Sequence, residues 1–551
     1  MTACVTDPVY DSLIPDLTLD ELQDKTNHVG ALAIDTKNYK GETVARVLVN
    51  GIDAGPGIII LNRAGFFRLE IFQESAGSST PAVIRVVILH PDRGETEWGL
   101  PPWSPAHPEE GLLGMQSVKL LHAPSVPQNR TIPMVVILED ELTRSDSYLY
   151  ASVGRNYFRI KRGVGSVQIP PNASQFGLSI EQQNFQLNIG SIDTPPQILS
   201  GELTADLHLE AGSYIHISAD LTIPEGMTMQ IDSGSFVTVA PEVNIYNKGL
   251  VLIKGSAGAP VTLTCNDGLA YWGGFIGSST GNRIEATYTI FSRSGHNTGG
   301  EYAYGHAGRQ ALFYSENGDL KLDHCYMIDH IGQVFYPLSC TLELSDCLVQ
   351  RAKTGGQINE SELRMEGCVF TDFPDDSFDY QDEDNDALYL NETNAVITNS
   401  VFMFAKDDGL DSGASGGGTV LIDRCRFEAN FHEGAALSSG STVNKLHRIS
   451  NSTFVNNGQG LELGYSSPNH QVEVDSCLFT GNGIGIRYGD CYEMPHHGYI
   501  HVSNSQSTDN AVKDVWNMNR EHWAADTSHM SFENVVLTIP DSMYPGLLIN
   551  D

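Results

Sequence analysis

A six-residue phrase of the form apolar-x-x-(Cys or Ser)-x-apolar recurs through the second half of the chain and constrains the fold more than any other feature. Examples are Leu322-Asp323-His324-Cys325-Tyr326-Met327 and Ile449-Ser450-Asn451-Ser452-Thr453-Phe454. The small residue falls at positions 325, 347, 368, 400, 425, 452 and 477, in steps of 21 to 32 residues. A small residue that returns at such spacing indicates one structural unit repeated along the chain.

Each unit contains two or three short strands, and Gly, Asn or Asp follows each strand. This is the length of one coil of a parallel β-helix, in which a coil buries its inward side chains only by stacking on the next. Leucine-rich repeats have a similar length, but their Leu-x-x-Leu-x-Leu framework is missing, and ankyrin or tetratricopeptide repeats would need helical periodicity. The sequence therefore predicts an all-β fold with a parallel β-helix over residues 199–540.

The phrase resembles the right-handed parallel β-helix repeats of carbohydrate-active enzymes and surface proteins, over roughly residues 200 to 540. Five of the nine cysteines occupy the small position of the phrase, where Ser stands in other coils. A position that accepts Ser or Cys alike is most simply a small packed side chain. A disulfide remains the alternative, because stacked coils bring residues near disulfide distance.

The residues before the repeat divide into three regions. Residues 29–166 contain short alternating strands separated by turns, which predicts an immunoglobulin-like β-sandwich region of one or two modules. Residues 167–198 are expected to be a connector, and residues 541–551 a C-terminal tail. Residues 1–28 are polar and are interpreted as a tether. Cys4 follows a small residue, as at the end of a bacterial lipoprotein signal, so it is a candidate for lipidation, the alternative being an ordinary thiol.

The charge of the chain limits its partners. With 32 basic and 68 acidic residues the formal net charge is −36, which repels the phosphates of nucleic acids. Cations, or a polyanion reached through bound cations, fit this sign better. No apolar run approaches the roughly 18 to 20 residues that span a bilayer, so a membrane would be reached only through a lipid anchor.

A second repeating phrase, x-(Gly or Ala)-apolar-X, begins a strand in five coils, for example Asp408-Gly409-Leu410-Asp411 and Gln459-Gly460-Leu461-Glu462. If the apolar residue points inward, strand alternation sends X outward, and X residues of successive coils stack about 4.8 Å apart. We expect an exposed column suited to an extended polymer. It consists of Tyr389, Asp411, Ala436, Glu462 and Arg487, of which Tyr389, Glu462 and Arg487 are candidate substrate-binding residues.

Acidic residues gather on two of these coils. Stacking Asp386 on Asp408 places four carboxylates close together, those of Asp386, Asp407, Asp408 and Asp411. Such carboxylates repel one another unless a cation neutralises them, and loosely spaced oxygen ligands favour Ca²⁺ over Mg²⁺. The sequence therefore predicts a calcium site, against the alternative that these are solvated acidic turns.

The acidic cluster is similar to the calcium site of family 9 pectate lyases. That resemblance implies Ca²⁺ bound by the four Asp residues and a Lys, one coil further on, that abstracts the proton α to the uronate carboxylate. Two positions depart from the family pattern: Leu410 replaces an aromatic residue, and Ala436 occupies the place of the base. Substitute candidates for the catalytic base are Lys406, His432 and Lys353, with Lys445 further along the chain.

Aromatic and basic residues on the coils before the acidic ones form a possible sugar-binding face, in which His306, Arg309 and His330 are the polar candidates. Aromatic rings stack on sugar faces, and Arg or His can meet carboxylate substituents. Coil packing is the competing explanation. A glycoside hydrolase is another alternative, since Asp407, Asp408, Asp411, His432 and Glu433 could supply its pair of carboxylates.

These features together predict an exported, lipid-anchored bacterial protein of the cell surface or periplasm. Its expected function is calcium-dependent recognition of an acidic, uronate-containing polysaccharide, with β-elimination as the possible reaction. Two alternatives stay open. One is a non-catalytic β-helix scaffold that binds glycan or an outer-membrane protein partner, and the other is an inverting glycoside hydrolase.

Overall fold

The computed structural model describes the greater part of the chain. The described residues are 16–17, 32–35, 45–49, 52–55, 58–61, 65–73, 83–89, 96–98, 118–127, 130–138, 148–153, 156–161, 163–169, 178–180, 183–185 and 189–549, the last range without 269, 374–384, 406, 414–416, 429, 431, 440–442, 456, 467–468, 490–496, 511–512, 518–528 and 539–546. Within these residues every regular element is a β-strand. They form two compact units, one of Met1–Trp103 with Thr371–Asp551 and one of Ser104–Phe370.

The unit of residues 104–370 begins with an antiparallel sheet of order β16-β15-β12-β13-β14-β11-β9. Its strands are β9 (Val118–Leu121), β11 (Ile132–Leu138), β12 (Tyr148–Val153), β13 (Asn156–Lys161), β14 (Val164–Ile169), β15 (Leu178–Ile180) and β16 (Gln183–Phe185), and a separate parallel pair joins β10 (Ser125–Pro127) to β17 (Gly190–Ile192). The strands β15 and β16 lie in the segment that was expected to be a connector. The alternating pattern there is too short and too polar to stand out in the sequence.

Parallel coils follow in the same unit. Their strands are β18 (Gln197–Glu202), β19 (Leu207–Leu209), β20 (Tyr214–Ile223), β21 (Thr228–Asp232), β22 (Phe236–Val239), β23 (Ile245–Asn247), β24 (Leu250–Lys254), β25 (Val261–Cys265), β26 (Phe275–Gly277), β27 (Arg283–Ser292), β28 (Ala303–Tyr304), β29 (Arg309–Glu316), β30 (Asp319–Leu338), β31 (Thr341–Ser345), β32 (Leu348–Asn359), β33 (Glu362–Glu366) and β34 (Val369–Phe373). Apart from the antiparallel hairpin of β28 and β29, these strands pair in parallel with those of the next coil.

The antiparallel sheet packs on the coils of its own unit. Met134, Val136 and Val167 of the sheet share one buried apolar cluster with Phe236 of β22. A polar contact adds to this packing, because the Arg351 guanidinium on β32 donates to the backbone oxygen of Ser166 at 3.0 Å. The apolar cluster is buried and the polar contact is partly buried, and both hold the sheet against the coils.

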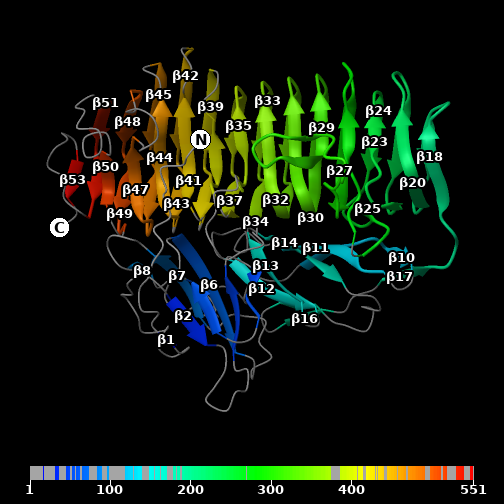
Figure 1. Cartoon of the computed structure of the whole chain (residues 1–551), viewed down its shortest axis with the longest axis horizontal. Coiled ribbons are helices and arrows are strands. Elements are labelled where there is room, and N and C mark those ends of the chain that lie inside the picture. Colours follow the sequence, from blue (N-terminus) through cyan, green and yellow to red (C-terminus); the bar gives the residue numbers. More distant parts are fainter. Residues whose placement is uncertain are drawn as a thin grey trace. The chain divides into compact units, whose positions relative to one another are not determined.

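The unit that contains residues 371–551 has the same kind of stacked coils. Its coil strands are β35 (Tyr389–Asn391), β36 (Asn394–Thr398), β37 (Val401–Ala405), β38 (Leu410–Ser412), β39 (Gly418–Asp423), β40 (Arg426–Glu428), β41 (Glu433–Ser439), β42 (Lys445–Ser450), β43 (Thr453–Val455), β44 (Gln459–Ser466), β45 (His470–Asp475), β46 (Leu478–Thr480), β47 (Ile484–Tyr488), β48 (Tyr499–Ser503), β49 (Gln506–Thr508), β50 (Lys513–Asn517), β51 (His529–Glu533), β52 (Val535–Leu537) and β53 (Leu547–Ile549). Each strand from β35 to β49 pairs in parallel with the third strand after it, as β39, β42, β45 and β48 do (Figure 1), and β53 pairs with β52.

The same unit contains two sheets from the N-terminal part of the chain. One has the order β1-β2-β5, with β1 (Asp16–Leu17), β2 (Leu32–Asp35) and β5 (Ile58–Leu61). The other has the order β4-β3-β6-β7-β8 and is antiparallel, with β3 (Ala45–Val49), β4 (Ile52–Asp53), β6 (Gly65–Gln73), β7 (Val83–Leu89) and β8 (Thr96–Trp98). The region predicted as sandwich modules therefore supplies sheets to both units.

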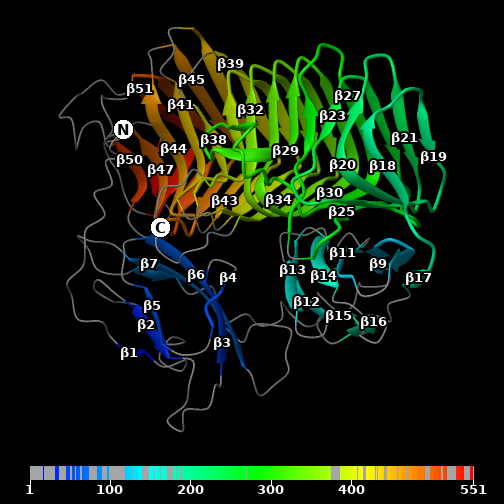
Figure 2. The same cartoon turned by 45° about the vertical axis from the view of Figure 1, so that its right-hand side comes forward.

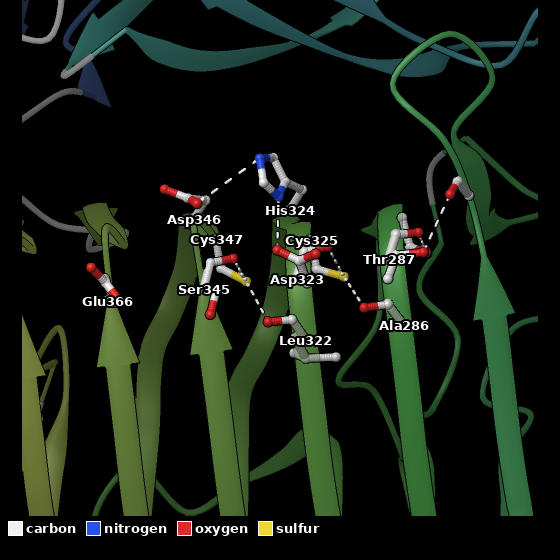
Figure 3. Close-up of polar contacts among 12 residues, drawn as sticks. Ala286, Thr287, Leu322, Asp323, His324, Cys325, Ser345, Asp346, Cys347 and Glu366 are labelled. Atoms are coloured by element: carbon white, nitrogen blue, oxygen red, sulfur yellow. Dashed lines mark hydrogen bonds and ion pairs between the residues drawn. The ribbon is translucent and has the colours of Figure 1, made fainter.

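The first repeating phrase forms one corner of each coil. The residue before the small one has a left-handed backbone, with φ of 51° at His324 and 49° at Asp346. The thiol of Cys325 then donates to the Ala286 oxygen at 3.3 Å, and that of Cys347 to the Leu322 oxygen at 3.5 Å (Figure 3). These contacts join each coil to the preceding one.

Serine takes the same place as cysteine in this corner. Cys347 Sγ lies 3.3 Å from the oxygen of the residue two positions earlier, and Ser452 Oγ donates to the corresponding oxygen at 2.7 Å. Both side chains are small and donate to a strand carbonyl, which explains the exchange of Cys and Ser along the sequence. All seven cysteines among the described residues are free thiols and buried.

A ladder of asparagines holds the next corner of the coils, between β40 and β41 and between β43 and β44. The Asn430 side chain donates to Asn457 Oδ1 at 3.0 Å, Asn457 to Asn482 at 3.0 Å, and Asn482 to Asn510 at 3.1 Å. Each amide of the first three also donates to the backbone oxygen of a buried Phe on the preceding coil. Because Asn430 and Asn457 come just before β41 and β44, the ladder sets the path of the backbone into those strands.

Candidate functional site

Five coils align the second repeating phrase as the sequence predicts. Tyr389 pairs with Asp411, Asp411 with Ala436, Ala436 with Glu462, and Glu462 with Arg487. Figure 2 shows the strands that carry the last four of these residues, β38, β41, β44 and β47, side by side. The predicted column is confirmed in its register.

Its exposure differs from the expectation. Tyr389 and Glu462 are buried, whereas Asp411, Ala436 and Arg487 are half-buried. Two local contacts explain the difference. The Tyr389 hydroxyl lies over Gly413, where an added Cβ would come within 1.8 Å of the hydroxyl oxygen. Glu462 is covered by Arg487, whose Nη2 lies 2.7 Å from Glu462 Oε2.

The first position of the same phrase forms a corner beside the column. The backbone N–H of Asp408 donates to Asp386 Oδ1 at 3.3 Å, and that of Glu433 donates to Asp408 Oδ1 at 2.9 Å. Each of these two aspartates therefore satisfies a backbone donor of the next coil, which is a common use of Asp in turns. Their side chains point toward the corner rather than into open solvent.

Four titratable side chains meet at this corner. One ligand atom from each of Asp407, Asp408, His432 and Glu433 lies within 4.8 Å of the others. His432 Nδ1 is 2.7 Å from Glu433 Oε2, 3.3 Å from Asp407 Oδ1 and 3.9 Å from Asp408 Oδ1. Its side chain is 31% exposed, compared with 1% for Glu433, so His432 is the member that faces solvent. We call these four residues the histidine–carboxylate cluster.

A chain of polar contacts joins this cluster to the column. Gln459 Nε2 donates to Glu433 Oε1 and, at 3.3 Å, to Glu462 Oε2. Glu462 in turn pairs with Arg487. Sequence reasoning missed Gln459, although it occupies the first position of the repeating phrase, as Asp408 and Glu433 do on the two preceding coils.

Burial and neighbouring charge set the protonation of the cluster. Burial raises the pKa of Asp408, and the charges of Glu433 and Asp407 raise it further. Burial also raises the pKa of Glu433, to which the charge of Glu462 adds. Burial alone would lower the pKa of His432, but the hydrogen bond and charge of Asp407 outweigh it and raise that pKa to about 9. At neutral pH the imidazole is therefore a cation, and the raised pKa values of Asp408 and Glu433 favour their protonated forms.

The predicted calcium ligands do not share one centre. Asp407 and Asp408 belong to the histidine–carboxylate cluster, whereas Asp386 and Asp411 are not in that group. Asp386 accepts a hydrogen bond from the backbone N–H of Asp408 instead. The negative charge of Asp411 raises the pKa of Lys445. The cluster includes the imidazole of His432, whose nitrogen is a more usual ligand of transition metals than of a hard cation. The cluster therefore differs from the oxygen-only site that the sequence predicts, and calcium binding stays a prediction.

The other predicted site residues of the unit of residues 104–370 belong to its coils. His306 and Arg309 are exposed, and Lys353 on β32 is half-buried. His330 is only 4% exposed, and its Nδ1 lies 2.8 Å from Ser294 Oγ. Burial lowers the pKa of His330 to about 3, so it is a neutral interior residue. The prediction that His330 belongs to a sugar-binding face is wrong, because its side chain packs inward, away from the surface.

Two further predicted residues, Lys406 and Cys4, lie outside the described residues.

Lys445 also lies inside the coils. It is 3% exposed, and its Nζ donates to the backbone oxygens of Gly413 at 2.6 Å and Ser438 at 3.1 Å. Burial lowers the pKa of Lys445 to about 8. Because its ammonium is buried and donates to backbone oxygens of two neighbouring coils, we assign Lys445 a structural role.

A comparison with protein families agrees with this architecture. Residues 339–512 match a family described as a right-handed β-helix region. No curated protein gives a significant match. Among solved structures, the chain is similar to a double mutant of the periplasmic alginate epimerase AlgG, with 11% sequence identity, a TM-score of 0.30, and coverage of 62% of this chain and 78% of that chain. The family match and the stacked parallel strands confirm the predicted all-β, right-handed β-helix fold class.

In the part of the chain that the structure describes, no helix has the length and apolar character needed to cross a membrane.

Proposed function

We propose that the protein binds an acidic, uronate-containing polysaccharide along the column and cleaves it by β-elimination, with His432 as the general base. The observation that carries this proposal is the position of His432. Its imidazole is 31% exposed beside the column, while Nδ1 is held by Glu433 at 2.7 Å. A partly exposed titratable group with a strongly raised pKa, oriented by buried carboxyls, is the arrangement expected of a proton-transfer site.

The column supports binding of an extended chain. Its residues repeat at the spacing of the coils, which suits a polymer laid across them. Tyr389 is buried, so the polar contact that the column offers to an acidic chain comes from the half-buried Arg487, whose guanidinium pairs with Glu462 in the absence of substrate. Near neutral pH the His432 cation adds a second positive charge for a uronate carboxylate. These two cations support binding of an acidic chain by a protein of net charge −36.

The reaction would use the neutral form of His432. Because the carboxyls hold Nδ1, we assign proton transfer to Nε2. The imidazole takes the proton α to the uronate carboxylate, the electron pair forms the carbon–carbon double bond, and the glycosidic carbon–oxygen bond breaks. The leaving oxygen takes a proton from solvent or from the cluster. Atoms and charge balance without an oxidant or a metal ion.

Hydrolysis by an inverting mechanism has less support. The carboxyl oxygens of Asp407, Asp408 and Glu433 lie within 4.8 Å of one another, closer than the roughly 6.5–9.5 Å that an inverting hydrolase needs for its water. Calcium dependence stays a prediction, and no step above passes through the ion. The effect of a chelator on activity tests it.

One observation favours a non-catalytic scaffold as the second candidate. Asp408 caps the Glu433 backbone N–H at 2.9 Å, and the Glu433 side chain is 1% exposed, so both have structural work in the coil corner. On this reading the column binds glycan, or an outer-membrane protein partner, without cleaving it.

A panel of uronate polymers separates these candidates. The full chain is incubated with each polymer, with Ca²⁺ and with chelator, while the ultraviolet absorbance of unsaturated product and the release of reducing ends are followed. β-Elimination raises both signals, hydrolysis raises only reducing ends, and binding alone raises neither but retards the protein in gels that contain the polymer. His432→Gln is expected to abolish unsaturated product and keep retardation. His501→Gln is the matched control, since His501 lies on β48 and its Nδ1 bonds Ser531.

Export, surface location and a lipid on Cys4 remain part of the proposal. Labelling of the protein with fatty acid in a bacterial host, compared with a Cys4→Ser variant, tests the anchor. Equal labelling of both proteins would remove it.

A further inference from the structure

A polar pocket of about 360 Å³ lies in the unit of residues 104–370, between the antiparallel sheet and the coils. Arg130 and Thr131, just before β11, line one side, and Thr264, Asn266 and Arg293 line the other. The volume falls near the lower end of the range of about 300–1,000 Å³ that is typical of small-molecule sites. The pocket is independent of the histidine–carboxylate cluster, whose residues belong to the other unit.

Both arginines are held in place by backbone contacts. Arg130 Nη1 donates to the backbone oxygen of Asn266, and Arg293 Nε donates to that of Ala270 at 3.2 Å. The Arg293 guanidinium also lies 4.8 Å from the centre of the Tyr271 ring. A guanidinium has five N–H donors, so each arginine keeps most of its donors for other partners.

The charge of these arginines is not balanced by an ion pair. Among the residues that the structure describes, neither Arg130 nor Arg293 has an ion pair with a carboxylate. The nearby thiol of Cys265 has its pKa raised by burial and stays neutral. Two such guanidinium groups in one pocket stand out in a chain with 68 acidic and 32 basic residues. They make the pocket a site for an anionic group.

One residue that lines the pocket has an unsatisfied hydrogen-bond acceptor. Asn266 Oδ1 is buried and has no hydrogen-bond partner among the described residues. A buried acceptor without a partner costs about 1–3 kcal/mol, so a ligand that donates to it gains affinity. An inorganic anion that only accepts hydrogen bonds would leave this oxygen unsatisfied. A ligand with a hydroxyl beside its anionic group would satisfy both the arginines and Asn266.

We propose that this pocket binds a sugar acid, with its carboxylate on Arg130 and Arg293 and a hydroxyl donated to Asn266 Oδ1. Thr131 lines the same space and offers a hydroxyl to another oxygen of the sugar, whereas the Thr264 hydroxyl already accepts a hydrogen bond from Ser292 Oγ at 2.8 Å. The ligand is either a free sugar acid or the terminal unit of an acidic polysaccharide, since both present the same group.

Calorimetric titration of the full chain with D-glucuronate tests the proposal, with D-glucose and sodium sulfate as comparison ligands. Glucuronate is expected to bind more tightly than either. Arg130→Gln and Arg293→Gln are each expected to weaken glucuronate binding at least about tenfold, because each removes a charge-assisted hydrogen bond. Arg283→Gln, an exposed arginine of the same unit that pairs with Glu285, is the matched control and should leave the affinity unchanged.

A second variant protects the test against misfolding. Asn266→Asp keeps the size and the acceptor oxygen but adds a negative charge that competes with the ligand carboxylate for Arg130 and Arg293, so glucuronate binding should weaken strongly while thermal unfolding changes little. A glucuronate trimer that binds more tightly than the monosaccharide, and loses affinity in the Arg variants, assigns the end of a polymer. Tighter or equal binding of the monosaccharide assigns a free sugar acid.

The proposal is overturned if wild-type protein fails to bind glucuronate, if sulfate or glucose binds equally well, or if both Arg variants and Asn266→Asp keep wild-type affinity. His432→Gln separates this site from the proposed cleavage site. That variant should bind glucuronate as wild type does even if no polymer is cleaved.

Discussion

Arg351 holds Asp329 at two points, with Nε 2.5 Å from Oδ1 and Nη2 3.2 Å from Oδ2. The same guanidinium donates to Ser166 Oγ at 3.0 Å, and Gln168 Nε2 donates to Asp329 Oδ2 at 2.6 Å. Residues of the antiparallel sheet and of the coils therefore share one polar network. Its ion pair lies largely inside the protein, since the Asp329 side chain is 17% exposed.

Loss of Arg351 is expected to destabilise the unit of residues 104–370. Arg351→Met removes the positive charge and leaves Asp329 buried without its ion pair. We expect a loss of about 3 kcal/mol in the free energy of unfolding, near the lower end of the effect of breaking a buried pair, because Arg351 is 27% exposed. Urea unfolding followed by fluorescence measures this. The double variant with Asp329→Asn should recover part of the loss, and a fully additive double variant would contradict the coupling.

The Arg351–Asp329 pair also makes the free energy of unfolding depend on pH in the acid range. Burial would raise the pKa of Asp329, but Arg351 and the hydrogen bond from Gln168 outweigh it and lower that pKa. A lowered folded-state pKa adds stability that is present above the unfolded pKa and is lost as pH falls through the folded one. We expect the unfolding free energy to decrease below about pH 4. In Asp329→Asn this part of the acid dependence should disappear, and an unchanged pH curve would refute the assignment.

His432 predicts the opposite dependence, at alkaline pH. Its folded pKa of about 9 lies above the ordinary value of 6.5, so its contribution to stability is full below about pH 6.5 and is lost as pH rises through about 9. If His432 is the base for β-elimination, the cleavage rate should rise over the same interval, because only the neutral imidazole accepts a proton. The pH dependence of kcat/KM and a direct titration by NMR measure both. A rate that falls from pH 7 to 9 would exclude His432 as the base.

The asparagine ladder is expected to carry a large part of the stability of its coils. Asn457 receives hydrogen bonds from the backbone and side chain of Asn430 at 3.0 Å, and its own amide donates to Phe427 O at 3.0 Å. Asn457→Ala leaves these buried groups without partners, which should cost about 3 kcal/mol. Thermal unfolding of Asn457→Ala measures the effect, with the exposed Gln471→Ala as control. Equal melting of both variants would contradict the role of the ladder.

The small position of the first phrase should accept serine but not a larger side chain. Cys347→Ser keeps a donor to the Ser345 oxygen, which the thiol approaches at 3.3 Å, so we expect a change below about 1 kcal/mol. Cys347→Leu adds volume at a site that is 2% exposed and should cost about 1–3 kcal/mol. Denaturant unfolding compares the two variants. Similar losses for both would indicate that the thiol itself is needed.

The sequence alone determined the fold class and the register of the column. Repeating phrases return once per coil, and parallel stacking pairs residues that occupy equivalent places in neighbouring coils, so Glu462 and Arg487 could be placed side by side before any coordinates. The same reasoning found the small corner position and its structural use, because Cys347 and Ser452 occupy one place in the repeat.

Tertiary structure alone decided which acidic residues share a site. Spacing placed Asp386 and Asp411 with Asp407 and Asp408, but the direction of a side chain at a coil corner depends on the local backbone and on the donor that it meets. Asp386 turns to the backbone of Asp408, and His432 enters the cluster in its place. The pocket of Arg130 and Arg293 had no sequence signal, because its two sides come from segments that only packing of the sheet on the coils brings together.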